Sequence, residues 1–124
     1  MTGDPNNRPI DMNELSEIMD HDDELAKECF NDFLQTSSEL LAKIKAAIDA
    51  KDADGLDQIA HRFKGTLKYL AATSAAEKAY ELELMGKRNE LNKADETYSA
   101  LFEECSSVKA FMKKYCEQGM DFRA

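Results

Sequence analysis

Apolar residues recur every three or four positions along most of the chain, and this spacing places them on one face of a helix. The pattern predicts a short amphipathic helix within residues 10–19 and one long helix of about eight turns over residues 22–50. Three more helices are predicted over residues 56–72, 74–89 and 94–119. Four main helices with short connections bury their apolar faces most economically as an antiparallel four-helix bundle. We therefore expect an all-α fold, with the short additional N-terminal helix closing one end of the core.

Polar residues near the predicted helix starts indicate how the helices begin. The acids DDE at 22–24 suit a helix N-terminus, where the helix dipole favours negative charge. In the turn KDADG at 51–55, Asp54 is a plausible N-cap for the helix that follows. Ser74 and Glu77, in the sequence SAAE, form a capping-box pattern.

The chain of 124 residues is long enough for one domain, and it is one-third charged with only five Gly and two Pro. This composition is typical of an all-helical protein without a substantial sheet. We expect a flexible N-terminal arm over residues 1–9, one bundle domain over 10–119 and a C-terminal tail over 120–124. No window approaches the roughly 20 apolar residues of a membrane span, and the first residues have no apolar signal-peptide region. A cytoplasmic protein that does not bind membranes is expected.

The net charge of −9 is concentrated in one half of the chain. Residues 1–60 contain 15 acids and 5 bases, whereas residues 61–124 contain 10 acids and 11 bases. An acidic surface without a Lys/Arg-rich run repels phosphate backbones, which argues against a nucleic acid partner. The three cysteines have no CxxC or zinc-site spacing. Because Cys29 and Cys105 fall on apolar stripes, we expect reduced thiols in the core.

One histidine faces away from the predicted core. On a helical wheel of about 100° per residue, five apolar residues lie roughly 160° to 240° from His61: Leu56, Ile59, Phe63, Leu67 and Leu70. Gly65 lies about 40° to one side of His61, and Lys64 and Lys68 lie within about 60° on the other side. His61 is therefore predicted to face water.

Glycine inside a helix costs roughly 0.5–1 kcal/mol relative to alanine, so Gly65 needs a reason. One explanation is a close contact between Gly65 and another helix. The position of Gly65 beside His61 instead favours an uncovered point on the helix surface, through which another molecule can approach the imidazole. Arg62, Lys64 and Lys68 make the surroundings positive, with no acid between residues 61 and 69. The simplest alternative is that His61 is a surface histidine without a function. Neutral imidazole, however, is a nucleophile near pH 7, and phosphoryl transfer needs mainly positioning and charge stabilisation.

The segment AHRFKG resembles the A-H-x-L-K-G signature of histidine-containing phosphotransfer (HPt) domains, the carriers of two-component phosphorelays. The resemblance covers about residues 22–91, including the paired Phe of the long helix, the run KAAIDAKDADGLDQIAHRFKGTLKYLAATSAAEKAYELE, and the LE pair that ends at Glu83. The last helix resembles the family only by its periodicity. The chain departs from the family at LAA over 70–72, where L-G-A is usual, at Phe63, where Leu is commoner, and after Glu83, where GKRNEL replaces an R-x-G-D ending.

The resemblance implies a role for each residue of the cluster. His61 would be the phosphoacceptor, and Lys64 would offset the charge of the phosphoryl group. Gly65 would let a receiver domain bring its aspartate close to the imidazole. The partner-docking surface would include five residues: Gly65, Lys68, Gln58, Arg62 and Glu83. Glu83 would lie near the residue that bonds the imidazole in some members of the family.

The absence of a nucleotide-binding loop indicates which partners could donate phosphate to the chain. There is no Gly-rich nucleotide loop, so His61 is not expected to take phosphate directly from ATP. The phosphoryl group would come from a receiver-domain aspartate, and the receiver would also bring Mg²⁺, so no cofactor or metal of the chain's own is expected. Receiver domains, a hybrid histidine kinase, or both are the expected partners of a monomeric carrier.

Two other functions stay open at this point. One is a helical bundle that regulates a histidine kinase or receiver by binding, without productive phosphorylation. The other is a helical adaptor whose resemblance is accidental, in which His61 would be replaceable without consequence.

Overall fold

The computed structural model describes residues 9–118, and this part of the chain is built from helices without strands. Five helices follow one another along the chain: α1 (Met12–Ile18), α2 (Asp23–Asp49), α3 (Ala53–Tyr69), α4 (Thr73–Arg88) and α5 (Ala94–Glu117). The predicted all-α bundle with a short N-terminal helix is therefore confirmed. The predicted tail, and all of the predicted arm except Pro9, lie outside the described residues, so the division into arm, domain and tail stays a prediction.

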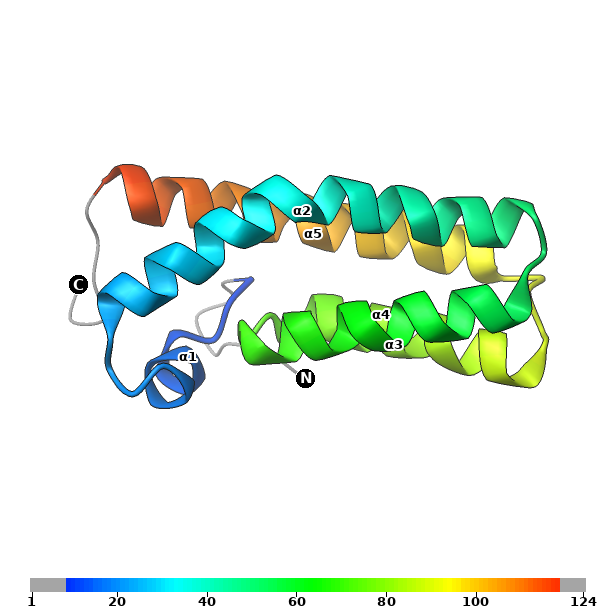
Figure 1. Ribbon diagram of the computed structural model, residues 1–124, viewed down its shortest axis with the longest axis horizontal. Helices are drawn as coiled ribbons and strands as arrows, with labels where there is room; N and C mark the ends of the chain where they lie inside the picture. Colours follow the sequence, from blue (N-terminus) through cyan, green and yellow to red (C-terminus); the bar gives the residue numbers. More distant parts are fainter. Residues whose placement is uncertain (1–8, 119–124) are drawn as a thin grey trace.

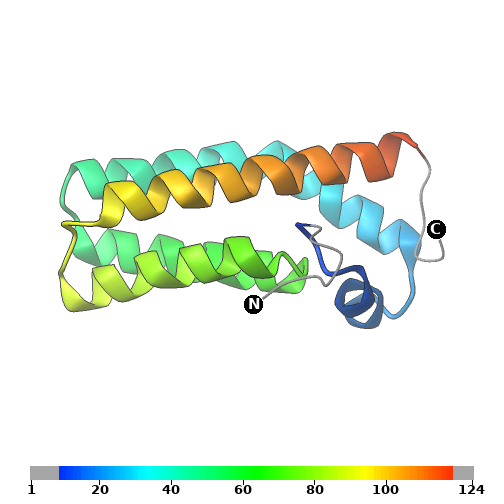
Figure 2. The same cartoon turned by 180° about the vertical axis from the view of Figure 1, so that it is seen from behind.

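The four long helices lie side by side in two layers, with α2 and α5 in one layer and α3 and α4 in the other (Figure 1). Seen from behind, α5 and α4 are in front of α2 and α3 (Figure 2). Helix α1 lies across the end of the bundle where α3 finishes. The backbone nitrogen of Asp11, the N-cap of α1, donates a 2.9 Å hydrogen bond to the backbone oxygen of Ala71 just after α3. Helix α1 thereby covers one end of the core, as predicted.

The core between the layers consists of aliphatic and aromatic side chains from all five helices. Phe33 of α2 stacks on Phe63 of α3 with 6.0 Å between the ring centroids, and Phe30 of α2 meets Tyr115 of α5 edge to face. Cys105 is fully buried in this core, as predicted, whereas Cys29 is only partly buried at its edge. All three cysteines are free.

Helices α3 and α4 approach each other closely because the buried face of α4 is made largely of small residues: Ala75, Ala76, Ala79 and Gly86. A methyl group added at Gly86 would lie 2.7 Å from both the backbone oxygen of Ala53 and the backbone nitrogen of Asp57. Only glycine fits at this point without moving backbone. The small residues therefore set the distance at which side chains of α3 and α4 meet.

The predicted N-cap of α3 is wrong by two residues. Helix α3 begins at Ala53, and its N-cap is Asp52, whose side chain accepts a 2.9 Å hydrogen bond from the backbone nitrogen of Gly55. Asp54 lies inside the first turn. Lys51, with φ of 55°, turns the chain shortly after α2 and leaves Asp52 in a non-helical conformation just before α3, as a cap requires.

The predicted capping box of α4 does not form. Helix α3 ends at Tyr69 rather than at residue 72, and the buried turn that follows leads directly into α4 at Thr73. The N-cap position falls on Ala72, which has no side-chain oxygen, so Ser74 is already inside the helix. Ala71 adopts φ of 56° in this turn, which is the conformation that favours glycine.

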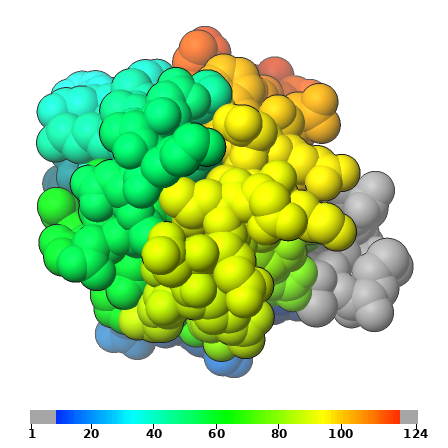
Figure 3. Space-filling view, turned by 90° about the vertical axis from the view of Figure 1, so that its right-hand side faces the viewer, coloured from blue at the N-terminus to red at the C-terminus, as the bar shows by residue number. Residues whose placement is uncertain are grey.

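The other end of the bundle is closed by the α2–α3 and α4–α5 connections, which lie against each other in green and yellow (Figure 3). There Lys45 of α2 pairs with Asp95 of α5 at 3.2 Å. Helix α4 ends at Arg88, close to the predicted end, and its C-cap is the left-handed residue Asn89. Helix α5 ends at Glu117, and the predicted end at Gly119 lies outside the described residues. No helix among residues 9–118 has the length and apolar character needed to cross a membrane.

Candidate functional site

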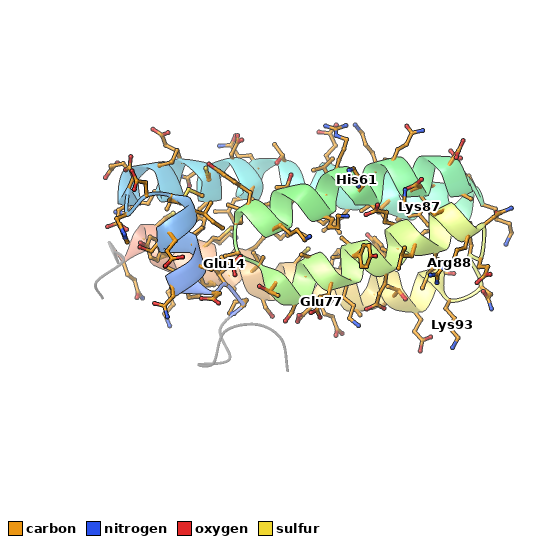
Figure 4. The ribbon with its side chains drawn as sticks, turned by 90° about the horizontal axis from the view of Figure 1, so that it is seen from below. Glu14, His61, Glu77, Lys87, Arg88 and Lys93 are labelled. Carbon is orange, nitrogen blue, oxygen red and sulfur yellow. The ribbon has the colours of Figure 1, made fainter. Side chains whose placement is uncertain are left out.

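His61 lies on the outer surface of α3, near the middle of the helix (Figure 4). Its side chain is 64% exposed, while Leu56, Phe63 and Leu67 of the opposite face are fully buried. The helical wheel therefore predicted the orientation of His61 correctly. It was wrong about Ile59, which is only partly buried, because the core-facing side of α3 is turned towards α4 and buries Ala60 instead.

A buried carboxylate holds one edge of the imidazole. Glu83 of α4 is 4% exposed, and its Oε2 lies 3.0 Å from Nδ1 of His61. An ionised carboxylate only accepts hydrogen bonds, so Nδ1 carries the proton and donates to Glu83. This bond selects the tautomer whose Nε2 has a free lone pair. Because Nδ1 is bound to Glu83, Nε2 is the nitrogen left to react.

Lys64 occupies a different position from the one expected on an exposed helix face. Its side chain is only 15% exposed, and its Nζ lies 2.8 Å from Oε1 of Glu83. The same ammonium group lies over the ring of Tyr80, 4.9 Å from the ring centroid. The two oxygens of Glu83 thus bind two groups of α3, one each: the imidazole and the ammonium.

A second lysine stands close to the same carboxylate. Nζ of Lys87, one turn after Glu83 on α4, lies 3.7 Å from Oε2 of Glu83 and 3.2 Å from Oδ1 of Asp57. Burial raises the pKa of Glu83, but the hydrogen bonds from Lys64 and His61 outweigh burial, and the net pKa is lowered. Glu83 is therefore ionised at neutral pH and remains an acceptor for the imidazole.

Gly65 leaves free space on the helix surface beside His61. A methyl group added at Gly65 would meet nothing within 4 Å, and the residue is exposed. A close helix contact therefore does not explain Gly65; such a contact is found at Gly86 instead. Gln58, Arg62 and Lys68 are also exposed on α3. Glu83, which was predicted to belong to the docking surface, is buried instead, because its carboxylate faces α3 and binds His61 and Lys64 there.

A groove of about 680 Å³ begins next to this site. It lies between α1, α3 and α4 and is lined by seven residues: Glu14, Lys64, Lys68, Thr73, Ala76, Glu77 and Tyr80. Figure 4 shows Glu14 on α1 and Glu77 on α4 at this end of the bundle. Lys64 and Tyr80 belong both to the groove and to the surroundings of His61.

Sequence reasoning missed Tyr80 and Lys87. Lys87 follows Glu83 by four residues, and this spacing is a signal for an ion pair on one helix face. No sequence signal pairs Tyr80 with Lys64, because the contact depends on how α3 and α4 pack. In residues 9–118 no three His, Cys, Asp or Glu side chains come together as a metal site.

Comparison with known families agrees with this geometry. The sequence model for the Hpt domain matches residues 28–111, from α2 to most of α5. The chain belongs to the Hpt domain family. The adaptor alternative, in which the resemblance is accidental, is therefore wrong. No protein in the search of curated proteins matches the chain.

One solved structure is similar to most of this chain. The crystal structure of histidine-containing phosphotransfer protein B (HptB) from Pseudomonas aeruginosa PAO1 superimposes with a TM-score of 0.77 and 28% sequence identity. The match covers 86% of this chain and 90% of the HptB chain. As an Hpt domain, the chain carries out histidine phosphotransfer in a phosphorelay. Hpt domains work with receiver domains and histidine kinases.

Proposed function

We propose that His61 is the phosphoacceptor, which takes a phosphoryl group from the aspartate of one receiver domain and relays it to another. The observation that carries this proposal is the bond between Nδ1 of His61 and the buried carboxylate of Glu83. That bond leaves Nε2 as a nucleophile on an exposed side chain. The alternative, regulation of a kinase or receiver by binding alone, gains no support from either comparison.

The transfer can be written at the level of bonds. The lone pair of Nε2 of His61 attacks the phosphorus of the aspartyl phosphate, an N–P bond forms, and the P–O bond to the receiver's carboxylate breaks. The carboxylate leaves with the electron pair, and Nδ1 keeps its proton. The ring gains positive charge as the N–P bond forms, and the Glu83 carboxylate, 3.0 Å from Nδ1, stabilises that charge. Return of the phosphoryl group to a second aspartate reverses these changes.

Lys64 would stabilise the phosphoryl group through its positive charge. A phosphoryl group brings up to about two negative charges, more than the single charge of Glu83. Lys64 can therefore exchange its contact with Glu83 for one with the phosphoryl group. Glu83 would keep the hydrogen bond from His61 and the nearby ammonium of Lys87. The buried carboxylate is thus not left without a partner.

The docking surface would surround His61 on α3. Gly65 leaves space for the receiver to approach, and Gln58, Arg62 and Lys68 would contact the receiver at the edges. We propose that the protein acts as a cytoplasmic monomer and that Mg²⁺ arrives with the receiver. The hard cation would be held by the receiver's own carboxylates, which is the ligand type Mg²⁺ prefers.

Intact mass after incubation with a phosphorylated receiver domain and Mg²⁺ tests this function. The wild-type protein is expected to gain one acid-labile phosphate, and His61→Gln is expected to gain none. The chain contains two histidines, so His21→Gln is the matched control and should accept phosphate like the wild type. Far-UV circular dichroism would verify that both variants are folded. Equal phosphorylation of His61→Gln and wild type would refute the assignment of His61.

A further inference from the structure

We propose that Tyr80 is a positioning residue for phosphotransfer: its ring holds the ammonium of Lys64 next to the imidazole of His61. This inference rests on the proposed function of His61. Tyr80 is on α4, one turn before Glu83, so its side chain and that of Glu83 face α3 together. The Lys64 ammonium lies between the two, 2.8 Å from Oε1 of Glu83 and 4.9 Å from the ring centroid of Tyr80.

The environment of Lys64 differs from that of its neighbour on the same helix. Lys68, one turn further along α3, is exposed, whereas the side chain of Lys64 is 15% exposed. A lysine side chain has many rotamers, and an exposed one spends little time in any single position. Confinement between Glu83 and Tyr80 therefore reduces the positions that Lys64 visits. Since Glu83 also binds His61, the confined ammonium has a defined position relative to the ring.

An aromatic face suits this task better than another carboxylate would. The ring attracts the ammonium through its quadrupole but does not neutralise its charge. A phosphoryl group that arrives on Nε2 of His61 carries full negative charges, so it can take the place of Glu83 beside the ammonium while the ring still contacts the Lys64 side chain. Tyr80 thus keeps Lys64 close to the reaction without preventing its move to the phosphoryl group.

Core packing does not account for the position of Tyr80. The side chain is 46% exposed and lies outside the core cluster. Within residues 9–118 its hydroxyl makes no hydrogen bond, and its ring contacts the ammonium of Lys64. The ring rather than the hydroxyl is therefore the part of Tyr80 that acts, and phenylalanine should replace it.

The first measurement uses NMR to detect where the Lys64 side chain lies relative to the ring of Tyr80. In the unphosphorylated wild type, the ring current of Tyr80 should shift the Hε resonance of Lys64 upfield. Tyr80→Phe should keep this shift, and Tyr80→Leu, which retains apolar bulk without a ring, should lose it. An Hε resonance of Lys64 that does not change in Tyr80→Leu would overturn the placement of the ammonium over the ring.

The second measurement is the rate of phosphotransfer from a saturating phosphorylated receiver. Tyr80→Leu is expected to slow transfer about two- to fivefold, which corresponds to a cation–π contact at an exposed site, and Tyr80→Phe is expected to transfer at the wild-type rate. In a Lys64→Met background, Tyr80→Leu should have no further effect. Phe102→Leu on α5 removes another exposed aromatic ring and should leave the rate unchanged.

The outcomes separate this inference from the proposed function. If the wild type is phosphorylated at His61 but Tyr80→Leu transfers at the wild-type rate, the role of Tyr80 is refuted while that of His61 stands. If the Tyr80→Leu defect persists in the Lys64→Met background, Tyr80 acts on the receiver and not through Lys64, and the inference also fails. If the wild type takes no phosphate on His61, the proposed function itself has failed.

Discussion

One methyl group added at Gly65 should make the protein more stable and a poorer phosphate carrier. Gly65 lies in the interior of α3, where glycine is less favourable than alanine by roughly 0.5–1 kcal/mol. The added methyl would meet nothing within 4 Å, so no steric cost offsets this gain. We expect Gly65→Ala to raise the free energy of unfolding by about 0.5–1 kcal/mol, and Tm by about 2–5 °C.

The same methyl should interfere with the approach of the receiver. It would stand one helical turn after His61 on the exposed face, where the two reacting groups must come within about 3–3.5 Å of each other. A displacement of about 1 Å can cost up to about 100-fold in rate. We therefore expect Gly65→Ala to slow phosphotransfer by about 10- to 100-fold while the protein stays folded.

Two assays on the same sample check both halves of this prediction. Urea unfolding followed by circular dichroism gives the free energy of unfolding, and a time course of intact mass with a phosphorylated receiver gives the transfer rate. A Gly65→Ala protein less stable than the wild type would contradict the open space found at this position. A more stable variant with an unchanged transfer rate would refute the role of Gly65 as an approach path.

Gly86→Ala is the matched control, since it makes the same chemical change in the opposite environment. Its methyl would lie 2.7 Å from backbone atoms of Ala53 and Asp57. Overpacking of this kind typically costs 1–3 kcal/mol, and the gain in helix propensity offsets only part of it. Gly86→Ala should therefore destabilise the protein, and a stabilised Gly86→Ala variant would show that α3 and α4 are further apart than described.

Three further predictions concern caps, pH and thiols. Asp52→Ala should lower the free energy of unfolding by about 0.5–2 kcal/mol, more than Asp54→Ala does, because Asp52 caps α3. If urea unfolding gave the same loss for both variants, the assignment of the cap to Asp52 would be wrong. The pKa of Glu83 is lowered in the folded state, so its stabilising contribution is complete above the ordinary value of 4.5 and is lost as pH falls through the lowered pKa. Wild type should therefore lose more stability than Glu83→Gln between about pH 6 and about pH 3, and parallel losses would show that Glu83 does not titrate in this way. Burial raises the pKa of Cys105 to about 12, so iodoacetamide at neutral pH should modify this thiol only after unfolding. Mass spectrometry of the alkylated peptides would show this, and rapid alkylation of Cys105 in the native protein would contradict its burial.

The positions of the helices were predictable because periodicity is a local property. Each helix of the bundle was expected within a few residues of where it lies, since its apolar spacing and its connections are encoded in adjacent residues. The caps of α3 and α4 were less predictable. Asp54 and Ser74 have the right chemistry for a cap, but the turns at Lys51 and Ala71 decide which residue occupies the cap position. Those turns bring whole helices into contact and depend on tertiary packing.

The sequence by itself determined that the protein is a helical bundle, that His61 faces outward and that Gly65 lies beside it. All of this follows from residue spacing within individual segments of the chain and from the short connections between them. The family resemblance only placed Glu83 near a residue that bonds the imidazole in some members. The tertiary structure decided that Glu83, 22 residues away, binds His61 and withdraws Lys64 from solvent. These contacts depend on the register and separation of α3 and α4, which small residues such as Gly86 set through backbone contact. A helical wheel gives the direction of a side chain, but it contains no information about which neighbouring helix will meet it.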